Sequence, residues 1–354
     1  MNSGLLYKDK PLFGIDIGTS SVKVMQIENH GKQQVIVGYG VTNYQQEALK
    51  DGIVVNPELL AKSTKELFEK NLVGSISTRR AAISIPVART YNRVMNLPAM
   101  NKKDLDEAVR LEAEQYIPVP IDDLYIDYNI TASSKDGFEL LAVAAPKQII
   151  DSYLNYTNLL GLEVCTIETT ISASSRLIAH SERDEVPTIL IDFGSVSVDI
   201  TIFDKQLIVT GTVAGGGDNF TDLIAKKLDV SNAVAHTIKT KYGLSVSKKQ
   251  KDIQDALKPI LSSLTREIRK MVRYYDERSG SEGKIGQIIT MGGGANMPGL
   301  SEHITSELRL PTRMCNPWAN LDFGKLQPPS TIEKSMYVTA AGLALINPKD
   351  IWHD

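Results

Sequence analysis

The chain has 354 residues, of which 42% are hydrophobic and 23% are charged, and its formal net charge is −3. This is the composition of a globular protein with two or three domains, and it excludes nucleic-acid binding through bulk positive charge. No run approaches the ~20 apolar residues that span a bilayer, and the N-terminus lacks the apolar run of a signal peptide. Cys165 and Cys315 have no metal-ligand spacing, so two reduced thiols in a cytoplasmic protein are the simplest interpretation.

The first 86 residues resemble the start of an α/β domain. Residues 12–41 contain three strand-like runs, with a turn at His30 and Gly31 between the second and the third. A helix is predicted from Pro57, because proline suits the first helical turn and apolar residues follow at helical spacing. Residues 80–87 form another strand-like run, so a meander, a crossover helix and a strand follow one another.

Residues 87–162 have the pattern of a separate α+β unit. A strand at 89–98 precedes an amphipathic helix at 101–117, which must stop before Pro118. Two paired strands then turn around 135–137, and a further helix ends at Gly161. This order predicts a compact insert within the larger fold.

The second half of the chain repeats the opening pattern. A strand that continues into a helix spans 164–181, and a linker at 182–187 leads to a second strand meander at 187–213. Further helices are predicted at 219–228, 231–243 and 252–278, with Pro259 as a potential kink. A strand, a glycine turn and a helix that starts near Met297 follow at 286–308, and the last predicted helix is 335–346.

Two short segments in these repeats match residue by residue. IDIGTSSV at 15–22 and IDFGSVSV at 191–198 share Ile, Asp, Gly, Ser and Val at one constant offset. One such turn is ordinary, whereas two in equivalent strand contexts favour a paired ligand site. Glycine admits a phosphate close to the backbone, and successive N–H groups form an anion-binding concavity. We therefore predict phosphate turns made of Gly18, Thr19, Ser20, Ser21 and Lys23 in the first copy, and of Gly194 and Ser195 in the second.

Asp16 and Asp192 belong to the same turns, where a carboxylate would repel a phosphate unless a cation accompanied it. Mg²⁺ takes oxygen ligands and keeps several waters, so we expect the two carboxylates to hold a hydrated Mg²⁺ across a cleft.

Two more glycine clusters are candidate ligand contacts, although a structural turn is an equal alternative for each. Gly292, Gly293 and Gly294 would admit a base and ribose, and Gly215, Gly216 and Gly217 precede a helix N-terminus that could face an anion. The chain contains neither a P-loop nor a G-x-G-x-x-G fingerprint.

These motifs resemble those of the actin, Hsp70 and sugar-kinase superfamily. Residues 13–27 are similar to its first phosphate motif, 190–203 to its second and 288–300 to its adenosine motif. Residues 167–177 and 340–345 resemble its two connecting helices. The resemblance implies an actin-like ATPase fold, two duplicated domains around a nucleotide cleft, with ATP and Mg²⁺ as ligands.

The same resemblance suggests roles for three charged residues. Glu168 takes the position of a water-orienting residue, and Glu267 and Lys270 take positions near the adenosine. For all three, a plain surface or capping role is the alternative. The rate of ATP hydrolysis is left open, and slow turnover at most is expected.

Within this superfamily, the insert resembles the 1C subdomain of the FtsA branch. Residues 49–60, 93–130 and 140–164 resemble the PilM family of type IV pilus assembly proteins. The resemblance implies a cytoplasmic ATP-binding scaffold of the inner-membrane platform of a type IV pilus or a related type II secretion system. Its partner would be the cytoplasmic N-terminal tail of a PilN-like membrane protein, bound between 1A and 1C. Membrane contact would be only through this partner, and self-association is left open.

The resemblance also implies a division into subdomains, and Leu97, Pro98 and Tyr116 are apolar candidates for the partner groove. The expected subdomains are 1A at 1–86, 163–187 and 330–354, 1C at 87–162, 2A at 188–220 and 286–329, and 2B at 221–285.

Two other functions compete with this one. An FtsA-like cell-division protein usually ends in an amphipathic membrane-binding helix, whereas the tail here offers only Trp352 among acidic residues. A small-molecule kinase of the same superfamily needs a base beside the acceptor hydroxyl, and no motif suggests such a pocket.

Overall fold

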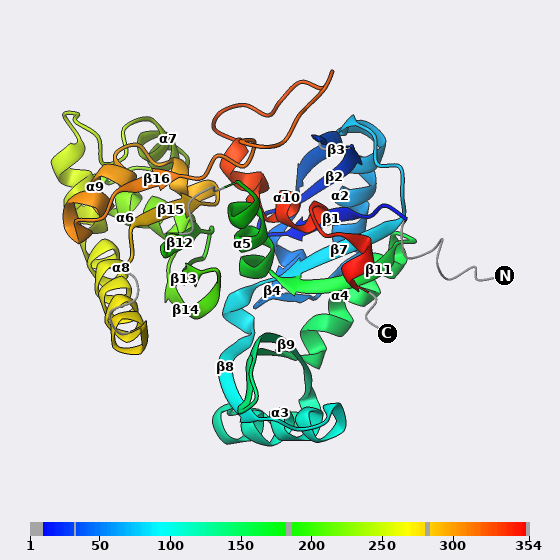
Figure 1. Cartoon of the computed structure of the whole chain (residues 1–354). Coiled ribbons are helices and arrows are strands. Elements are labelled where there is room, and N and C mark those ends of the chain that lie inside the picture. The colour runs from blue at the N-terminus through cyan, green and yellow to red at the C-terminus, as the bar shows by residue number, and fades with distance from the viewer. Residues whose placement is uncertain (1–9, 32, 182–185, 280–283, 352–354) are drawn as a thin grey trace.

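The computed structural model describes residues 10–31, 33–181, 186–279 and 284–351. Two lobes, each built on a mixed β-sheet, stand side by side, and a smaller three-stranded sheet lies below them in Figure 1. Trp352 and most of the predicted linker at 182–187 lie outside the described residues.

The sheet of the first lobe has the order β11-β7-β1-β2-β3-β6. The meander β1–β3 is antiparallel, whereas β7 and β11 run parallel to β1. The nearly continuous apolar run of β1 is buried along its whole length, as expected for a strand covered on both faces. The elements of this lobe are β1 Phe13–Ile17, β2 Ser21–His30, β3 Gln33–Asn43, β4 Leu49–Lys50, β5 Ile53–Val54, α2 Pro57–Lys70, β6 Val73–Gly74, β7 Arg80–Ile85, α4 Lys147–Leu159, β11 Glu163–Thr169, α5 Thr170–Ser181 and α10 Val338–Ala344.

The second lobe repeats this topology with the sheet order β14-β13-β12-β15-β16. Its first three strands are again antiparallel, and β15 and β16 again run parallel to the first. The duplication extends to the register, since Asp16 pairs with Lys23 across β1 and β2, and Asp192 pairs with Asp199 across β12 and β13. The elements are β12 Thr188–Phe193, β13 Ser197–Asp204, β14 Gln206–Ala214, α6 Gly217–Leu228, α7 Asn232–Lys241, α8 Gln250–Ser279, β15 Gln287–Met291, α9 Leu300–Leu308 and β16 Thr312–Met314.

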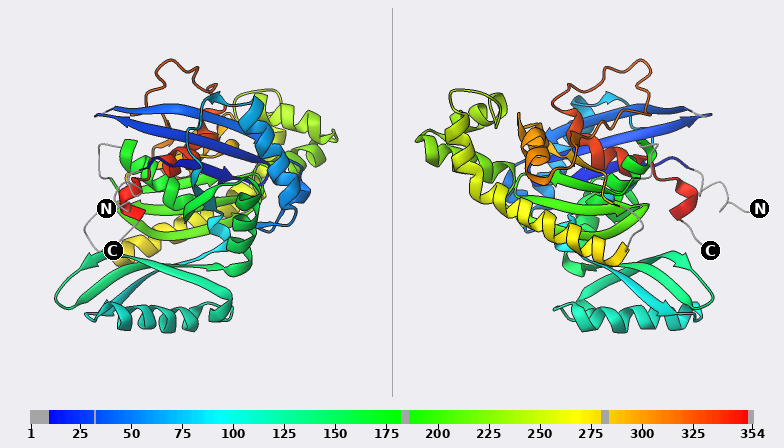
Figure 2. Two further views of the ribbon diagram at one scale, coloured as in Figure 1. Left: turned by 90° about the vertical axis from the view of Figure 1, so that its right-hand side faces the viewer. Right: turned by 60° about the vertical axis from the view of Figure 1, so that its left-hand side comes forward.

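The predicted insert forms a small unit of its own. β8 Tyr91–Pro98, β9 Leu124–Ser133 and β10 Gly137–Pro146 make an antiparallel sheet in the order β8-β10-β9. Helix α3 Lys102–Tyr116 lies along its outer face (Figure 2) and buries Leu105 and Val109 there. β10 continues directly into α4, which returns the chain to the first lobe. The equivalence of this unit to the 1C subdomain of FtsA, and all the subdomain boundaries, stay predictions.

Helices α5 and α10 lie between the two lobes (Figure 1) and cross at very short range. A Cβ on Gly342 of α10 would lie 1.8 Å from the carbonyl oxygen of Ala173 in α5, so only glycine fits at this crossing. Ser174 and Thr339 add a hydrogen bond between the helices at 3.2 Å.

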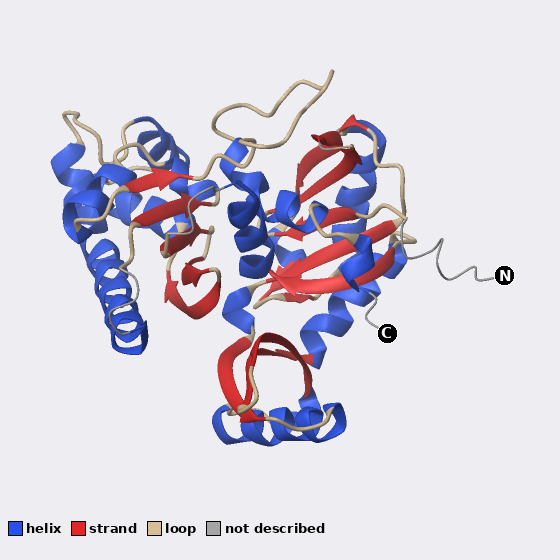
Figure 3. Cartoon of the chain, in the orientation of Figure 1, coloured by secondary structure: helices blue, strands red, loops and turns tan. Residues whose placement is uncertain are grey.

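A long loop, residues 315–333, joins β16 of the second lobe to the turn before α10 (Figure 3). It docks on the edge of the first sheet, where Ile36 N–H donates to the Asp322 carbonyl at 2.8 Å and Asp322 N–H donates to the Gln34 carbonyl at 2.9 Å. Two aromatic side chains of the loop, Trp318 and Phe323, pack edge to face against each other, and Phe323 packs in the same way against Tyr39 of β3. Tyr39 in turn packs edge to face against Tyr337.

The predicted secondary structure differs from the structure mainly at helix starts near glycines. The helix expected near Met297 begins at Leu300, because a 3₁₀ turn at Gly293–Asn296 precedes it and Gly299 adopts a left-handed conformation as its N-cap. The last helix is likewise shortened by a 3₁₀ turn at Lys334–Tyr337. The other 3₁₀ turns are Gln46–Ala48, Val87–Arg89, Ile121–Asp123 and Pro348–Ile351. Helices with both the length and the apolar composition needed to cross a membrane do not occur in the described part of the chain.

Candidate functional site

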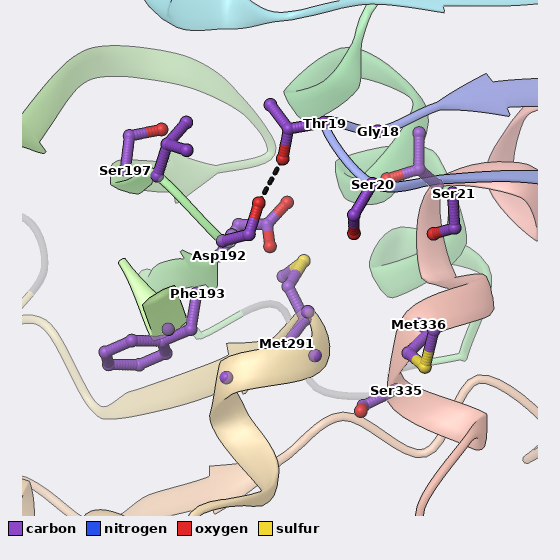
Figure 4. Close-up of a pocket in the computed structure, with 18 of the residues that line it drawn as sticks. Gly18, Thr19, Ser20, Ser21, Asp192, Phe193, Ser197, Met291, Ser335 and Met336 are labelled. Carbon is purple, nitrogen blue, oxygen red and sulfur yellow. Dashed lines mark hydrogen bonds between the residues drawn. The ribbon is translucent and has the colours of Figure 1, made fainter. Parts of the chain in front are cut away.

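A cavity of about 350 Å³ opens between the two lobes, where the paired turns meet. This volume is within the range of roughly 300–1,000 Å³ that is typical of small-molecule sites. Figure 4 shows the first turn and Asp192 lining the same pocket. The predicted site residues in its lining are Asp16, Gly18, Thr19, Ser20, Ser21, Lys23, Asp192, Gly194, Ser195, Gly217, Gly292, Gly293 and Gly294.

In the first turn, each carboxylate oxygen of Asp16 has one protein partner. Lys23 Nζ lies 3.1 Å from Oδ2, and the Ser84 hydroxyl donates to Oδ1 at 3.0 Å. The turn itself is closed by Gly18 N–H, which donates to the Ser21 carbonyl at 3.0 Å. A Cβ on Gly18 would lie 3.1 Å from Lys23 Nζ, so the ammonium group stands directly beside the predicted phosphate turn.

In the second turn, acidic groups face each other instead. Burial raises the pKa of Asp192 to about 7, with the charges of Asp199 and Asp16 adding to this and Lys23 opposing it. Burial also raises the pKa of Asp199 to about 6, although the Thr212 hydroxyl donates to its Oδ1 at 2.6 Å. This side of the cavity therefore carries negative charge that protein cations compensate only in part.

These carboxylates fit a divalent cation that keeps its water shell. A cation in the cavity would stabilise the ionised form of Asp192, which burial alone disfavours. Among the described residues, no group of three or more His, Cys, Asp or Glu side chains is placed to ligate a metal directly. The donor set thus fits an ion held through water better than a fully protein-ligated one.

The two turns touch across the cavity. The hydroxyls of Thr19 and Ser195 form a hydrogen bond (dashed in Figure 4), and these residues occupy equivalent positions in the repeat, 176 residues apart. The duplicated turns therefore face each other as a pair, which is the arrangement expected of two turns that hold one ligand.

The glycine cluster at 292–294 packs against the second turn and leaves space beside it. Gly292 has φ of 82°, and a Cβ there would lie 2.2 Å from Asp192 Oδ1. A Cβ on Gly294 would lie 2.9 Å from the Cβ of Phe193, whereas one on Gly293 would meet nothing closer than Met336 Cγ at 3.9 Å. Gly293 therefore faces open space in the cavity, whereas close packing explains why Gly292 and Gly294 are glycines.

The remaining cluster, Gly215 to Gly217, packs backbone to backbone against the second turn. Gly217 N–H donates to the Gly194 carbonyl at 2.9 Å, and Gly215 N–H donates to the Val196 carbonyl at 3.0 Å. A Cβ on Gly216 would lie 2.3 Å from the Gly194 carbonyl oxygen. Gly215 and Gly216 are absent from the cavity lining, so close packing is sufficient to explain why they are glycines.

The three charged residues assigned by resemblance lie away from the cavity lining. Glu168 pairs with Arg176 at 2.5 Å, and Arg176 also donates to the Gly342 carbonyl at 3.0 Å. Glu267 and Lys270 pair with each other at 3.1 Å on α8. Each of the three residues therefore has an ion-pair partner within the protein, and their ligand roles stay predictions.

Several cavity residues carry no sequence signal. From α7, His236, Lys239 and Thr240 line it, and from the turn before α10 so do Ser335 and Met336. Lys239 is buried, which lowers its pKa against the opposing charges of Asp218 and Asp222. Its Nζ donates to the Gly217 carbonyl at 2.6 Å and to the Thr221 hydroxyl at 2.8 Å.

Comparison with known proteins identifies the family of this chain. The sequence profile of the type IV pilus assembly protein PilM family matches residues 14–347. The chain belongs to the PilM family. The predicted family membership is thereby confirmed.

Similar curated proteins include cell division proteins FtsA. That of Pseudomonas aeruginosa is 24% identical over 88% of this chain and 84% of the relative, and that of Streptococcus pneumoniae is 22% identical over 82% and 72%. The matched segments thus extend over most of both chains.

Among solved structures, the PilM-PilN type IV pilus biogenesis complex matches with a TM-score of 0.82 and 23% identity, over 95% of this chain and 98% of that one. MreB5 of Spiroplasma citri bound to ADP matches with a TM-score of 0.54 and 13% identity, over 95% of each chain. These likenesses confirm the predicted actin-like fold.

Proposed function

We propose that this protein binds ATP with a hydrated Mg²⁺ in the cavity between its lobes and serves as a scaffold of type IV pilus assembly. The observation that carries the proposal is that Asp16 and Asp192 occupy equivalent positions in two duplicated turns, and that both turns line one cavity. Membership of the PilM family supports the role in type IV pilus assembly.

In this proposal, the first turn binds the phosphates and the second turn binds the cation. The hydroxyls of Thr19, Ser20 and Ser21, with the Lys23 ammonium beside them, would hold the phosphates. Asp192, with Asp199 behind it, would hold the hydrated cation, which neutralises phosphate charge when bound. Gly293 would leave room for the nucleoside.

We propose that hydrolysis is slow at most. Glu168, the candidate for orienting a water, is paired with Arg176 and lies outside the cavity lining. An ion pair that holds this carboxylate away from the cavity lining would disfavour its use in positioning an attacking water.

We further propose that the partner is the cytoplasmic N-terminal tail of a PilN-like inner-membrane protein, through which this protein reaches the membrane. A solved structure of similar fold is a PilM-PilN complex. The small sheet β8-β10-β9 with α3 would serve as the 1C-type docking unit, at 87–162. Of its predicted groove residues, Leu97 and Tyr116 pack in the unit's own core, while Pro98 is exposed.

Calorimetry tests the site. ATP should bind with Mg²⁺ present, and Asp16→Ala and Asp192→Ala should each weaken that binding at least tenfold, while the control Asp255→Ala on the exposed face of α8 should not. A synthetic peptide with the tail sequence of a PilN-like protein should bind with micromolar affinity or better. Absence of ATP binding in the presence of Mg²⁺ would refute the proposed nucleotide site.

A further inference from the structure

Behind the first phosphate turn lies a buried tyrosine that holds it from the core side. The Tyr44 hydroxyl donates to the Gly18 carbonyl, and the Tyr44 N–H donates to the Ser20 carbonyl at 3.3 Å. Tyr44 is 8% exposed and packs in the same core as Tyr153 and Tyr156 of α4. One residue therefore engages two carbonyl groups of the four-residue turn.

Holding these carbonyls matters for an anion site. A carbonyl oxygen directed at a phosphate repels it, whereas the N–H groups of a turn attract it. Burial, with the charge of Asp16 added, raises the pKa of the Tyr44 hydroxyl, so it remains a protonated donor. Tyr44 thus fixes two of the turn's acceptors on the core side, away from the cavity.

Next to Tyr44 in this core, Tyr153 is fully buried, and its hydroxyl finds no hydrogen-bond partner among the described residues. Burial, with the charges of Tyr44 and Asp16 added, raises the pKa of this hydroxyl as well. A buried polar group without a partner is unfavourable and calls for a physical explanation. The Tyr44 hydroxyl lies in the same core and donates to the Gly18 carbonyl, so it keeps acceptor lone pairs that a hydrogen bond from Tyr153 would use.

Helix α4 also contacts the small sheet. β10 ends at Pro146 and α4 begins at Lys147, whose Nζ lies 5.5 Å from the centre of the Tyr125 ring. The Tyr125 hydroxyl in β9 donates to Asp151 Oδ1 at 3.1 Å. The same helix therefore touches the core behind the phosphate turn and the unit proposed to dock the partner.

We propose that Tyr44 is a positioning residue for the bound phosphates, and that Tyr44 and Tyr153 couple occupancy of the cavity to the small sheet through α4. This inference rests on the proposed function, because it assumes ATP with Mg²⁺ at one end and a PilN-type tail at the other. Binding at either end would then change affinity at the other by the same factor.

The positioning step is tested with Tyr44→Phe and a matched control. Tyr156→Phe removes a buried hydroxyl from the same core, but one that bonds Thr64 Oγ1 at 2.8 Å and does not reach the turn. We expect Tyr44→Phe to weaken binding of ATP with Mg²⁺ roughly tenfold, the effect of one well-placed hydrogen bond, and Tyr156→Phe to change it less than twofold. Equal effects of the two substitutions would overturn the positioning role.

The coupling step is measured with the synthetic tail peptide in the presence and absence of ATP with Mg²⁺. In the wild type the two peptide affinities should differ by at least fivefold. In Tyr44→Phe and Tyr153→Phe the ratio should fall below twofold, while peptide affinity without nucleotide stays within twofold of wild type. The coupling would be overturned if both variants kept the wild-type ratio of peptide affinities. It would also be overturned if the wild type bound both ATP and the peptide but had the same peptide affinity with and without ATP.

Hydrogen exchange without nucleotide separates this inference from the proposed function. The amides of residues 17–21 should exchange faster in Tyr44→Phe than in the wild type or in Tyr156→Phe, because the turn loses its core-side anchor. Identical exchange in all three proteins would refute the positioning role even if ATP binds. A wild type that binds no ATP refutes the proposed function, and the exchange comparison still decides whether Tyr44 holds the turn.

Discussion

Gly292 and Gly293 are adjacent in the chain but meet different surroundings. A side chain on Gly292 would overlap the Asp192 carboxylate and strain a left-handed backbone, whereas one on Gly293 would point into open cavity. The first glycine is therefore required by the folded protein itself, and the second has no such requirement.

This contrast yields a prediction for Gly293→Ala. Because nothing obstructs the new methyl group in the protein, the melting temperature should stay within about 1 °C of wild type. Its affinity for ATP with Mg²⁺, measured by calorimetry, should fall at least tenfold because the methyl group takes nucleoside space. Gly292→Ala should lower both quantities. Unchanged ATP affinity in Gly293→Ala would show that the nucleoside lies elsewhere.

A second prediction concerns the charge on Asp192. Its pKa is raised from 3.8 to about 7 in the folded protein, so between these values the folded state binds more protons than the unfolded state. Stability from this group is therefore lost as pH rises through the folded pKa. Asp192→Asn should be more stable than wild type at pH 8, by about 1–2 kcal/mol, and the difference should vanish toward pH 4. Thermal unfolding of both proteins at pH 8, 6.5 and 5 measures this, and a difference independent of pH would contradict it.

Among the elements, the crossing of α5 and α10 is the tightest contact described. The carbonyl of Ala173 in α5 occupies the space that a side chain on Gly342 of α10 would need. Arg176, also in α5, donates a hydrogen bond to the Gly342 carbonyl. These contacts fix α5 and α10 to each other between the lobes.

Gly342→Ala is informative because it should raise the stability of the protein if the helices leave room for a methyl group and lower it if they do not. In an unobstructed helix, alanine would stabilise by about 1 kcal/mol over glycine. At this crossing the backbone must move, so we expect a loss of roughly 1–3 kcal/mol. Denaturant unfolding measures the change, and a stabilised variant would mean that the helices cross less closely than described.

How far the sequence predicts the elements depends on local signals. Strand alternation, Pro57 and Gly161 mark boundaries by their own conformational preferences, and those boundaries are found where predicted. Lys239 was missed because α7 carries no motif and reaches the cavity only through tertiary packing. Glu267 and Lys270 lie on α8, which packs along the edge strand β14, and no periodicity reveals which lobe surface a helix will cover.

At the scale of the whole molecule, several contacts join the lobes and the small sheet. Glu139 of β10 accepts from Gln206 at 2.7 Å and lies 3.6 Å from Arg278, both in the second lobe. The loop 315–333 crosses between the lobes, and Thr19 bonds Ser195 inside the cleft. A ligand that bridges the two turns should therefore stabilise the molecule as a whole.

Thermal unfolding with ATP tests this. At a hundredfold excess over Kd, ATP with Mg²⁺ should stabilise the protein by about 2.7 kcal/mol, a rise in Tm of roughly 4 °C for a chain of this size. Excess EDTA should remove most of that rise, because uncompensated phosphates would face Asp192. At the same ATP concentration, Asp16→Ala should show at most about half of that rise with Mg²⁺, because its affinity should be at least tenfold weaker. An equal rise with and without EDTA would exclude a role for the cation.

Among the equivalent positions at which the two copies of the turn differ, one carries opposite charges, because the first copy has Lys23 and the second has Asp199. This difference gives the cleft a polarity. A site assembled from two first copies would carry two ammonium groups, and one from two second copies would carry four carboxylates. Neither would suit a ligand with an anionic chain and a counterion. In the proposed nucleotide site, the first lobe would therefore be the anion side and the second lobe the cation side, so that the cleft would accept its ligand in a single direction.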